Sequence, residues 1–247
     1  MNKLSVCLLI RDENEYLQEW LDYYKDFGFD HVYIYDDRSQ NPISINTNYI
    51  TTIRWEQSIF ATQIEAYTDC IARFKDESEW IAFFDIDEFI RVNDGRDLKT
   101  YLDSLDKNIS GIYIPWEMHG ANGQLNKNMG GVRERFPTPL CMDGRGKCIV
   151  RSNMVNLMFP HWPVGLESQL VNADNSPLEN WQSGKNCGIV LEHYYTRSWE
   201  EWCNKIKRGS CMPDALKKKD EFFIYNPDMR YLLDEKDVEH EQQKYNA

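Results

Sequence analysis

The sequence has no long apolar run and few basic side chains for its number of acidic ones. Its longest apolar runs, Val6–Ile10 and Trp80–Phe84, are of strand length. They are far shorter than the roughly 20 residues that span a bilayer. The 247 residues include 28 Lys and Arg against 40 Asp and Glu, a formal net charge of −12. Since nonspecific binding to nucleic acid needs a basic surface, we expect neither a membrane span nor a nucleic-acid partner.

Three nucleotide and hydrolase motifs are also missing. The sequence contains no Gly-x-x-x-x-Gly-Lys-Ser/Thr loop and no Gly-x-Gly-x-x-Gly turn, which disfavours P-loop and dinucleotide-binding proteins. It contains no Gly-x-Ser-x-Gly elbow, so a serine hydrolase of the α/β type is disfavoured as well.

Seven cysteines are scattered along the chain without a Cys-x-x-Cys pair. An odd number in this arrangement is typical of reduced thiols in a cytosolic protein, and the spacing disfavours the alternative of a zinc site. The chain begins with Met1-Asn2-Lys3, and Arg11-Asp12-Glu13 ends the short apolar run that follows. We therefore expect no signal peptide and a cytoplasmic location.

Strand-like and helix-like segments alternate through the first half. Short runs typical of buried strands lie at 6–10, 31–35, 50–55, 80–84 and 111–114. Between them, apolar residues recur at helical spacing, in stripes from Leu17 to Tyr24, from Phe60 to Phe74 and from Leu98 to Leu105. This order predicts an α/β fold with a mostly parallel central sheet and helices on both faces. Ligands of such sheets bind beyond the carboxyl ends of the strands.

The second half is less regular. Residues 116–146 contain six glycines and few apolar residues, so we predict a long functional loop there. Short strands follow at 148–150 and 188–191, and Ser198 with Glu201 predicts a capped helix that runs to Lys207. The charged end, 234–247, is expected to fray.

The strongest candidate for chemistry is Asp85-Ile86-Asp87, directly after a predicted buried strand. Two carboxylates separated by one residue can share a divalent cation, and oxygen ligands suit Mg²⁺ or Mn²⁺ bound to phosphates. The alternative is a solvated strand end. Such a spacing also arises by chance, so the context of the strand carries the interpretation.

Two further candidates follow other strands. Asp36-Asp37 could hydrogen-bond a ribose or a base edge, or could simply form a turn. His193 could supply a metal ligand, with Lys205, Lys207 and Arg208 close by to neutralise a diphosphate. Alternatively, His193 is a satisfied buried histidine beside a basic helix face, and His161 competes for the same ligand role.

Several segments, taken in order, resemble glycosyltransferases. Leu8–Leu21 is similar to the opening of family-2-like glycosyltransferases, and Gly28–Asp37 resembles their second strand. Trp80–Phe89 resembles their metal-binding motif, the most specific of these segments. Trp116, Gly120 and Gly123 resemble an acceptor-side loop, and 147–150 and 193–209 resemble the C-terminal half. The most similar type is glycosyltransferase family 92, also called domain of unknown function 23, over residues 4–210.

This resemblance implies a GT-A-type fold, a nucleotide-diphosphate sugar donor that is usually UDP-linked, Mn²⁺ or Mg²⁺, and inversion at the anomeric carbon. It implies that Asp87 holds the cation with help from Asp85 and His193, which would neutralise the departing diphosphate. The donor-binding residues that it implies are Arg11, Glu13, Asp36, Asp37, Asp85, Lys147, Lys205 and Arg208.

Inversion by a single displacement needs a base for the acceptor hydroxyl. Glu134, just after the glycine-rich segment, is our first candidate. Its neighbours Arg133 and Arg135 are expected to pair with it, which fits a structural salt bridge equally well. Glu117, Asp143 and Glu167 stay open as alternatives.

The sequence thus predicts a metal-dependent inverting glycosyltransferase that extends a glycan or lipid-linked glycan in cell-surface polysaccharide synthesis. We expect one domain over 1–210, with a donor half (1–115) and an acceptor half (116–210), and a helical or extended tail over 211–247. Basic residues at 205–208 and 217–219 could contact the inner face of a membrane, or could be a solvated helix face. The rivals are a sugar nucleotidyltransferase and a non-catalytic protein that binds carbohydrate through Trp116, Trp162 and Trp181.

Overall fold

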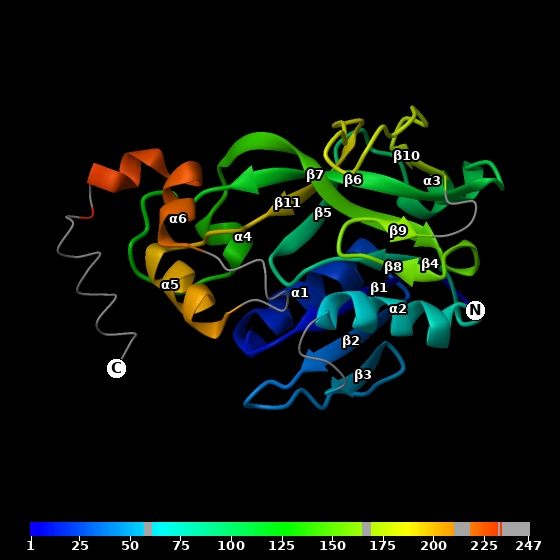
Figure 1. The fold of residues 1–247 in the computed structure, drawn as a ribbon, viewed down its shortest axis with the longest axis horizontal. Helices are drawn as coiled ribbons and strands as arrows, with labels where there is room; N and C mark the ends of the chain where they lie inside the picture. The colour runs from blue at the N-terminus through cyan, green and yellow to red at the C-terminus, as the bar shows by residue number, and fades with distance from the viewer. Residues whose placement is uncertain (57–60, 165–168, 210–217, 232, 234–247) are drawn as a thin grey trace.

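The computed structural model describes residues 1–56, 61–164, 169–209, 218–231 and 233 (Figure 1). Its centre is a nine-stranded sheet with the order β3-β2-β1-β4-β7-β6-β11-β5, in which β10 also pairs with β6. The strands are β1 (Asn2–Ile10), β2 (His31–Asp37), β3 (Ile50–Trp55), β4 (Ser78–Phe83), β5 (Glu88–Val92), β6 (Ile109–His119), β7 (Pro139–Arg151), β10 (Gln169–Asn172) and β11 (Ile189–His193).

Most of the strand pairs are parallel, as predicted. β1 lies parallel to both β2 and β4, β2 to β3, and β6 to both β10 and β11. Within this nine-stranded sheet, the antiparallel pairs all involve β7 or β5. Because β1, β2 and β4 point the same way, the residues that follow them meet at one edge of the sheet.

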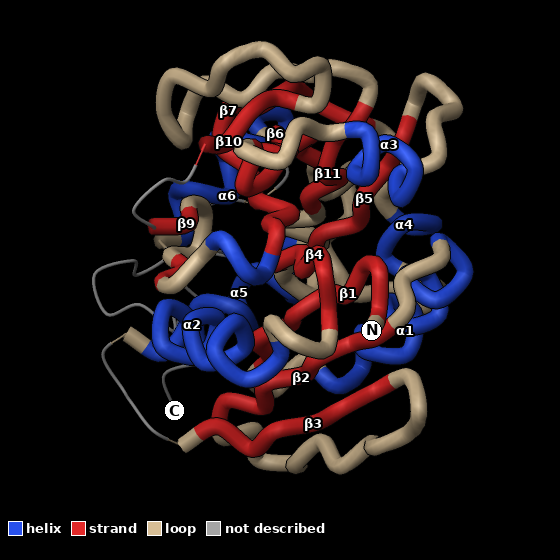
Figure 2. The backbone as a smooth tube through the Cα atoms, turned by 90° about the vertical axis from the view of Figure 1, so that its right-hand side faces the viewer, coloured by secondary structure: helices blue, strands red, loops and turns tan. Residues whose placement is uncertain are grey.

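Helices cover both faces of this sheet. Val6 and Leu8 of β1 share a core cluster with α1 (Asn14–Phe27), whereas Cys7 shares one with α2 (Thr62–Phe74). Figure 2 shows α1 and α2 on opposite sides of β1 and β2. Gly28 ends α1 in the left-handed conformation (φ 103°), which glycine adopts readily. Phe60, expected on the α2 stripe, lies outside the described residues.

The predicted loop over 116–146 is wrong at both of its ends. β6 continues to His119 and β7 begins at Pro139, and the two pair in antiparallel register. The glycines of β7 do not mark a loop there. A Cβ on Gly146 would lie 1.8 Å from the Ile114 carbonyl oxygen, so glycine permits the close approach of the two strands.

Shorter elements complete the fold, and α5 begins with the predicted capping box of Ser198 and Glu201. α6 packs against α5 through Trp199, Phe222 and Phe223, at the end of the molecule that carries both labels in Figure 1. These elements are α3 (Leu98–Ser104), α4 (Val132–Arg135), η1 (Ser152–Met154), β8 (Leu157–Met158), β9 (Pro163–Val164), α5 (Trp199–Arg208), α6 (Lys219–Tyr225) and η2 (Pro227–Tyr231).

Two further predictions concern thiols and membranes. Six cysteines lie in the described ranges and all are free thiols, as expected, whereas Cys211 lies outside these ranges. No helix within the described ranges is long and apolar enough to cross a membrane. Lys217 and the segment 234–247, for which we predicted a membrane contact and fraying, lie outside the description.

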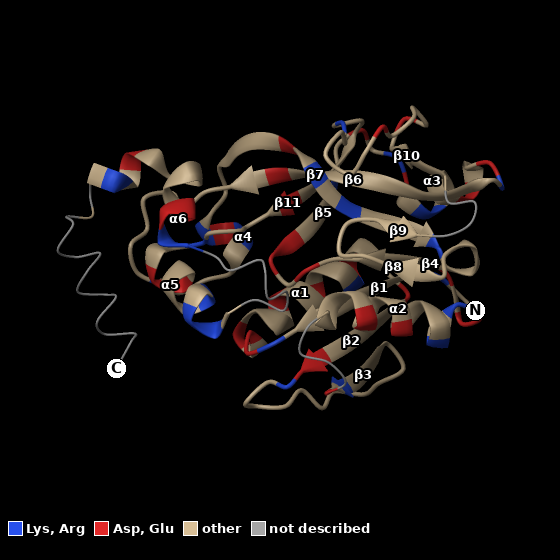
Figure 3. Ribbon diagram, viewed as in Figure 1, with Lys and Arg blue, Asp and Glu red and all other residues tan. Residues whose placement is uncertain are grey.

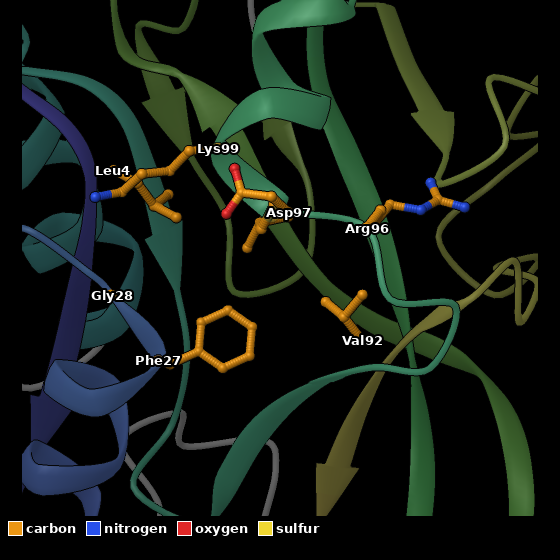
Figure 4. Close-up of a pocket in the computed structure, with 8 residues that line it drawn as sticks. Leu4, Phe27, Gly28, Val92, Arg96, Asp97 and Lys99 are labelled. Atoms are coloured by element: carbon orange, nitrogen blue, oxygen red, sulfur yellow. The ribbon is translucent and has the colours of Figure 1, made fainter.

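A pocket of about 320 Å³ lies at the edge of the sheet where the parallel strands begin, and Figure 4 shows the residues that line it. Leu4 of β1, the end of α1 at Phe27 and Gly28, and Lys99 of α3 line it. Lys99 is ion-paired with Asp30 at 2.6 Å. Since ligands of parallel sheets bind at the opposite edge, the functional site is to be sought at the carboxyl ends of the strands.

Candidate functional site

The acid pair lies at the carboxyl end of β4, in the short turn that leads into β5. The turn is fixed from outside: the Trp20 indole N–H donates to the Asp85 carbonyl oxygen at 3.1 Å. The Tyr194 backbone N–H donates to the Asp87 carbonyl oxygen at 2.9 Å. The backbone between the two carboxylates is therefore anchored to α1 on one side and to the residue after β11 on the other.

Asp85 is held by a lysine and by α2. Its Oδ2 lies 2.8 Å from Lys147 Nζ. Its Oδ1 accepts hydrogen bonds from Tyr67 Oη and Gln63 Nε2, both at 3.0 Å. Burial opposes ionisation, but the Lys147 ammonium outweighs it and the pKa of Asp85 is lowered. The side chain keeps 32% of its surface exposed, so a ligand can reach this carboxylate.

Asp87 is more deeply buried and has a lysine of its own. Its Oδ2 lies 2.5 Å from Lys205 Nζ, and its Oδ1 lies 3.7 Å from His193 Nε2. Burial again opposes the charge, but the Lys205 ammonium and the Arg197 guanidinium outweigh it and hold the pKa of Asp87 far below its usual range. Asp87 is therefore an ionised carboxylate inside the protein.

His193 presents a neutral imidazole to this carboxylate. Burial lowers its pKa to about 3. Its Nδ1 is buried without a hydrogen-bond partner among the described residues, and its ring lies 4.4 Å from the Trp116 ring. His161, the rival ligand, instead uses Nδ1 to reach the Gly146 carbonyl at 2.8 Å. The geometry thus favours His193 over His161 as the partner of Asp87.

Glu88 supports the acid pair and was missed by the sequence analysis. It is fully buried, and its two carboxylate oxygens accept from Trp116 Nε1 at 2.7 Å and from the Asp85 backbone N–H at 2.8 Å. Burial raises its pKa well above the usual value, which the nearby Lys147 only partly offsets. Its position directly after the acid pair was the available signal.

A second group of predicted residues meets beside the acid pair. Glu13 binds Arg208 through Oε2 and Arg197 through Oε1, both at 3.0 Å. Arg11 Nη1 lies 3.4 Å from Asp37 Oδ2, a buried atom without a hydrogen-bond partner among the described residues. A pocket of about 390 Å³ is lined by Glu13 and Arg208 and also by Lys205, which links this group to Asp87.

Charge is arranged accordingly at this edge. Figure 3 shows Lys and Arg gathered at the C-terminal end of α5, the end whose Arg208 pairs with Glu13. Two of the basic side chains predicted to contact a membrane, Lys205 and Arg208, therefore pair with carboxylates of the site.

Asp36 is turned into the protein. Its Oδ1 accepts from the Ser39 backbone N–H, and its Oδ2 accepts from the Ile43 N–H and from Arg54. Of the two interpretations that the sequence left open, the structure favours the turn, because both carboxylate oxygens already hold the segment after β2.

Glu134 is exposed on α4. The expectation that its flanking arginines pair with it is wrong. Arg133 lies 3.4 Å from a Glu192 oxygen, and Arg135 lies 2.7 Å from a Glu201 oxygen. Both arginines point to carboxylates of β11 and α5, which are nearer the core than the exposed Glu134.

The three tryptophans suggested for carbohydrate binding differ in exposure. Trp116 was expected to be exposed but is buried. Its ring packs against His193, and its indole N–H donates a hydrogen bond to Glu88. Trp162 is half-buried, whereas Trp181 is 42% exposed.

Comparisons with known proteins give one consistent family. The sequence profile described as glycosyltransferase family 92 matches residues 2–222. A family 92 protein of Arabidopsis thaliana is 28% identical over 234 residues, covering 84% of this chain and 37% of the relative. One of Ricinus communis is 22% identical over 220 residues, covering 84% of this chain and 38% of the relative. The chain thus spans less than half the length of these curated relatives.

Among solved structures, two glycosyltransferases show weak similarity. A Drosophila β1,4-galactosyltransferase 7 mutant in complex with manganese, UDP-Gal and xylobiose has a TM-score of 0.37 and 15% identity, covering 77% of this chain and 70% of that one. A mannosyltransferase of Pyrobaculum calidifontis in complex with GDP-Man and Mn²⁺ has a TM-score of 0.34 and 16% identity, covering 46% of this chain and 35% of that one. By the match of its sequence to the family profile over nearly its whole length, the chain belongs to glycosyltransferase family 92.

Proposed function

We propose that this protein is a metal-dependent, inverting glycosyltransferase that moves a sugar from a UDP-linked donor to a hydroxyl of a glycan. One observation carries the proposal. Two carboxylates at the carboxyl end of a parallel strand are each paired with a lysine, and a neutral imidazole stands beside the second. Membership of family 92 supports the same reaction class.

The residues present fit a divalent cation. Asp87 Oδ1 and His193 Nε2 lie 3.7 Å apart, a separation suited to two ligands of one ion. Asp85, whose carboxylate is turned toward Lys147, would have to move to join them. Carboxylate oxygens with one imidazole nitrogen suit Mn²⁺ or Mg²⁺. When bound there, the cation supplies Lewis-acid stabilisation of the departing diphosphate.

The chain's own residues would do the rest of the work at the donor. Lys205 and Arg208 line one pocket, and their positive charge can receive the phosphates. Arg11 follows β1 and lies 3.4 Å from Asp37 Oδ2 at the end of β2, so this pair stands at the edge of the sheet where the nucleoside would bind. Lys147 keeps Asp85 ionised and oriented toward the donor.

For the base that deprotonates the acceptor, we retain Glu134. It is exposed, and no ion pair of its carboxylate is found within the described part of the chain. Of the alternatives, Glu117 is paired with Arg91, Asp143 is paired with Arg145, and Glu167 lies outside the described residues. A carboxylate that is not already paired with a cation is free to accept a hydrogen bond from the acceptor hydroxyl.

We also propose a cellular location. We place the enzyme in the cytoplasm, at the inner face of the membrane, where it extends a lipid-linked glycan for cell-surface polysaccharide. A nucleotidyltransferase is disfavoured because the segment after β1 is acidic at Glu13 and Glu15, which would repel a triphosphate.

Thermal unfolding tests the proposal. UDP with Mn²⁺ should raise the melting temperature of the wild type, because ligands that bind only the folded state stabilise it. Asp87→Asn should abolish this shift. Asp30→Asn is the matched control, since Asp30 pairs with Lys99 at the opposite edge of the sheet, and should keep it. A wild type that shifts with no nucleoside diphosphate, or an Asp87→Asn variant that shifts like the wild type, refutes the proposal.

A further inference from the structure

A third pocket shares no lining residue with the pocket formed by Glu13, Lys205 and Arg208. It has a volume of about 420 Å³ and opens between the turn that joins β8 to β9 and the loop that precedes β11. Two of its aromatic side chains, Phe159 and Trp181, are 40% and 42% exposed. Its lining consists of Phe159, Pro160, His161, Trp162, Glu179, Asn180 and Trp181.

A row of aromatic rings connects this pocket to the acid pair. The Trp181 ring stacks on His161 with centroids 5.9 Å apart and planes inclined by 20°. His161 meets the edge of Trp116 at 5.2 Å, and Trp116 lies 4.4 Å from His193. His193 in turn faces Asp87 at 3.7 Å. A ligand seated on Trp181 would therefore lie at the outer end of this row, whose inner end faces Asp87.

The exposed Trp181 is held in place from behind. Its carbonyl oxygen accepts a hydrogen bond from Tyr113 Oη, and the Gly184 N–H donates to the Gly144 carbonyl at 2.9 Å. A Cβ on Gly144 would lie 2.1 Å from the Gln182 carbonyl oxygen, so glycine is needed for this close approach. The loop therefore presents a preformed aromatic face, which reduces the entropy lost on binding.

The rim adds polar groups without positive charge. No hydrogen bond or ion pair of the Glu179 carboxylate is found in the part of the chain that the structure describes. Asn180 is exposed, and its side-chain oxygen accepts from the Gln182 N–H at 2.9 Å. A flat apolar face with a carboxylate and an amide at its edge complements a pyranose ring, which has an apolar C–H face and hydroxyls around it. The carboxylate disfavours phosphates and anionic headgroups.

We propose that this pocket, defined by His161, Glu179 and Trp181, binds a pyranose ring of the glycan acceptor. The ring stacks on Trp181, and Glu179 and Asn180 bind its hydroxyls. This inference rests on the proposed function, which supplies the transfer site at the other end of the row of rings. It assigns recognition of the acceptor to Trp181 and leaves the donor to the residues around Asp87.

Saturation-transfer NMR with defined disaccharides tests this inference. Xylobiose, cellobiose, lactose and chitobiose would each be added at millimolar concentration to the full chain with UDP and Mn²⁺. The wild type should give a saturation-transfer signal with at least one of these disaccharides. Trp181→Ala should weaken that binding about tenfold or more, and Trp181→Phe should retain part of it because an aromatic face remains. Tyr231→Ala, which removes an aromatic side chain that is 91% exposed on η2, is the matched control.

The thermal shift with UDP and Mn²⁺ separates this inference from the proposed function. Trp181→Ala should keep the full shift while losing the disaccharide. Binding of the disaccharide by Trp181→Ala as by the wild type overturns the inference, and so does a wild type that saturates none of the four. Loss of the UDP shift in Trp181→Ala would place the pocket in the donor site and overturn it too. If the wild type shows no thermal shift with UDP and Mn²⁺, the proposed function is refuted instead.

Discussion

The acid pair shows how single residues make a buried negative site tolerable. A carboxylate taken out of water without a partner is costly, so buried carboxylates are paired or hydrogen-bonded. Here Lys147 of β7 forms an ion pair with Asp85, and Lys205 of α5 forms one with Asp87. The chain as a whole carries a net charge of −12, yet the site itself is locally balanced. This balance is what a cation and a diphosphate would redistribute.

The proposed base, Glu134, gives a kinetic prediction. Glu134→Gln removes the proton acceptor but keeps the size of the exposed side chain. We expect kcat for sugar transfer to fall about 10²- to 10⁴-fold, the usual contribution of a positioned base. The KM for the UDP-linked donor should stay unchanged, because Glu134 forms no ion pair with the donor-binding residues in the described part of the chain. Steady-state release of UDP with a saturating acceptor measures both constants.

Glu77→Gln is the control for this measurement, since Glu77 is exposed at the end of the turn after α2. It should leave both constants as in the wild type. Turnover in Glu134→Gln equal to that of the control would remove Glu134 from the reaction and direct attention to Glu167.

Which residues could be predicted depended on how far their partners lie along the chain. Asp85 and Asp87 could be identified because a buried strand precedes them directly. Their partners Tyr67 and Gln63 could not, because a helix 18 to 22 residues away brings them to Asp85 only once the sheet has formed. The inward direction of Asp36 was equally hidden, since it depends on Arg54 from the neighbouring strand.

Among the strands, the predicted parallel ones were confirmed, and the antiparallel pairing of β6 with β7 was missed. β1, β2 and β4 are buried on both faces, so their sequences are continuous apolar runs that identify them. The first residues of β7 are exposed and include glycine, which removes the alternation on which strand prediction depends. β7 nevertheless forms, because a long register with β6 supplies its hydrogen bonds.

The pairing of β6 and β7 yields a stability prediction. Gly146→Ala would place a methyl group 1.8 Å from the Ile114 carbonyl oxygen, so the two strands must separate locally. We expect a loss of about 1–3 kcal/mol, as for other overpacked interiors. For a chain of this size that is a drop of about 2–4 °C in melting temperature for each kcal/mol. Differential scanning calorimetry measures it.

Met142→Ala is the matched control in the same strand, because its side chain is 42% exposed and it lies on β7 as Gly146 does. It should shift the melting temperature little. An equal melting temperature for Gly146→Ala and the wild type would show that the strands accommodate a side chain there.

At the scale of the whole molecule, one carboxylate joins elements that are distant in the sequence. Glu201 of α5 accepts a bidentate pair of hydrogen bonds from Arg135 of α4, at 2.7 and 2.8 Å. It also accepts from Tyr16 of α1 at 2.7 Å and from the Ser198 hydroxyl that caps its own helix. The first helix of the chain, α1, is thereby joined to α4 and α5. Such a contact lies beyond sequence prediction, which identified Glu201 only as part of a capping box.

Glu201 therefore makes the stability of the molecule sensitive to acid. Burial opposes its charge, but the hydrogen bonds from Arg135, Ser198 and Tyr16 outweigh it and lower its pKa to about 2, below the ordinary 4.5. A group whose pKa is lower in the folded state adds stability above its unfolded pKa and loses that contribution as the pH falls through its folded pKa. Stability from Glu201 is thus complete above about pH 4.5 and declines toward pH 2.

Urea unfolding of the wild type and of Glu201→Gln at several pH values tests this. At pH 7 the variant should be less stable by about 3–5 kcal/mol, since Arg135 is left buried without its counter-charge. That difference should shrink as the pH is lowered from 5 toward 3, because the Glu201 carboxylate of the unfolded wild type takes up a proton below about pH 4.5 while the folded one stays ionised. Glu200→Gln, at the neighbouring position of α5, should show a small difference at every pH. A gap between wild type and Glu201→Gln that stays constant with pH would mean that packing around residue 201, and not its charge, holds these helices together.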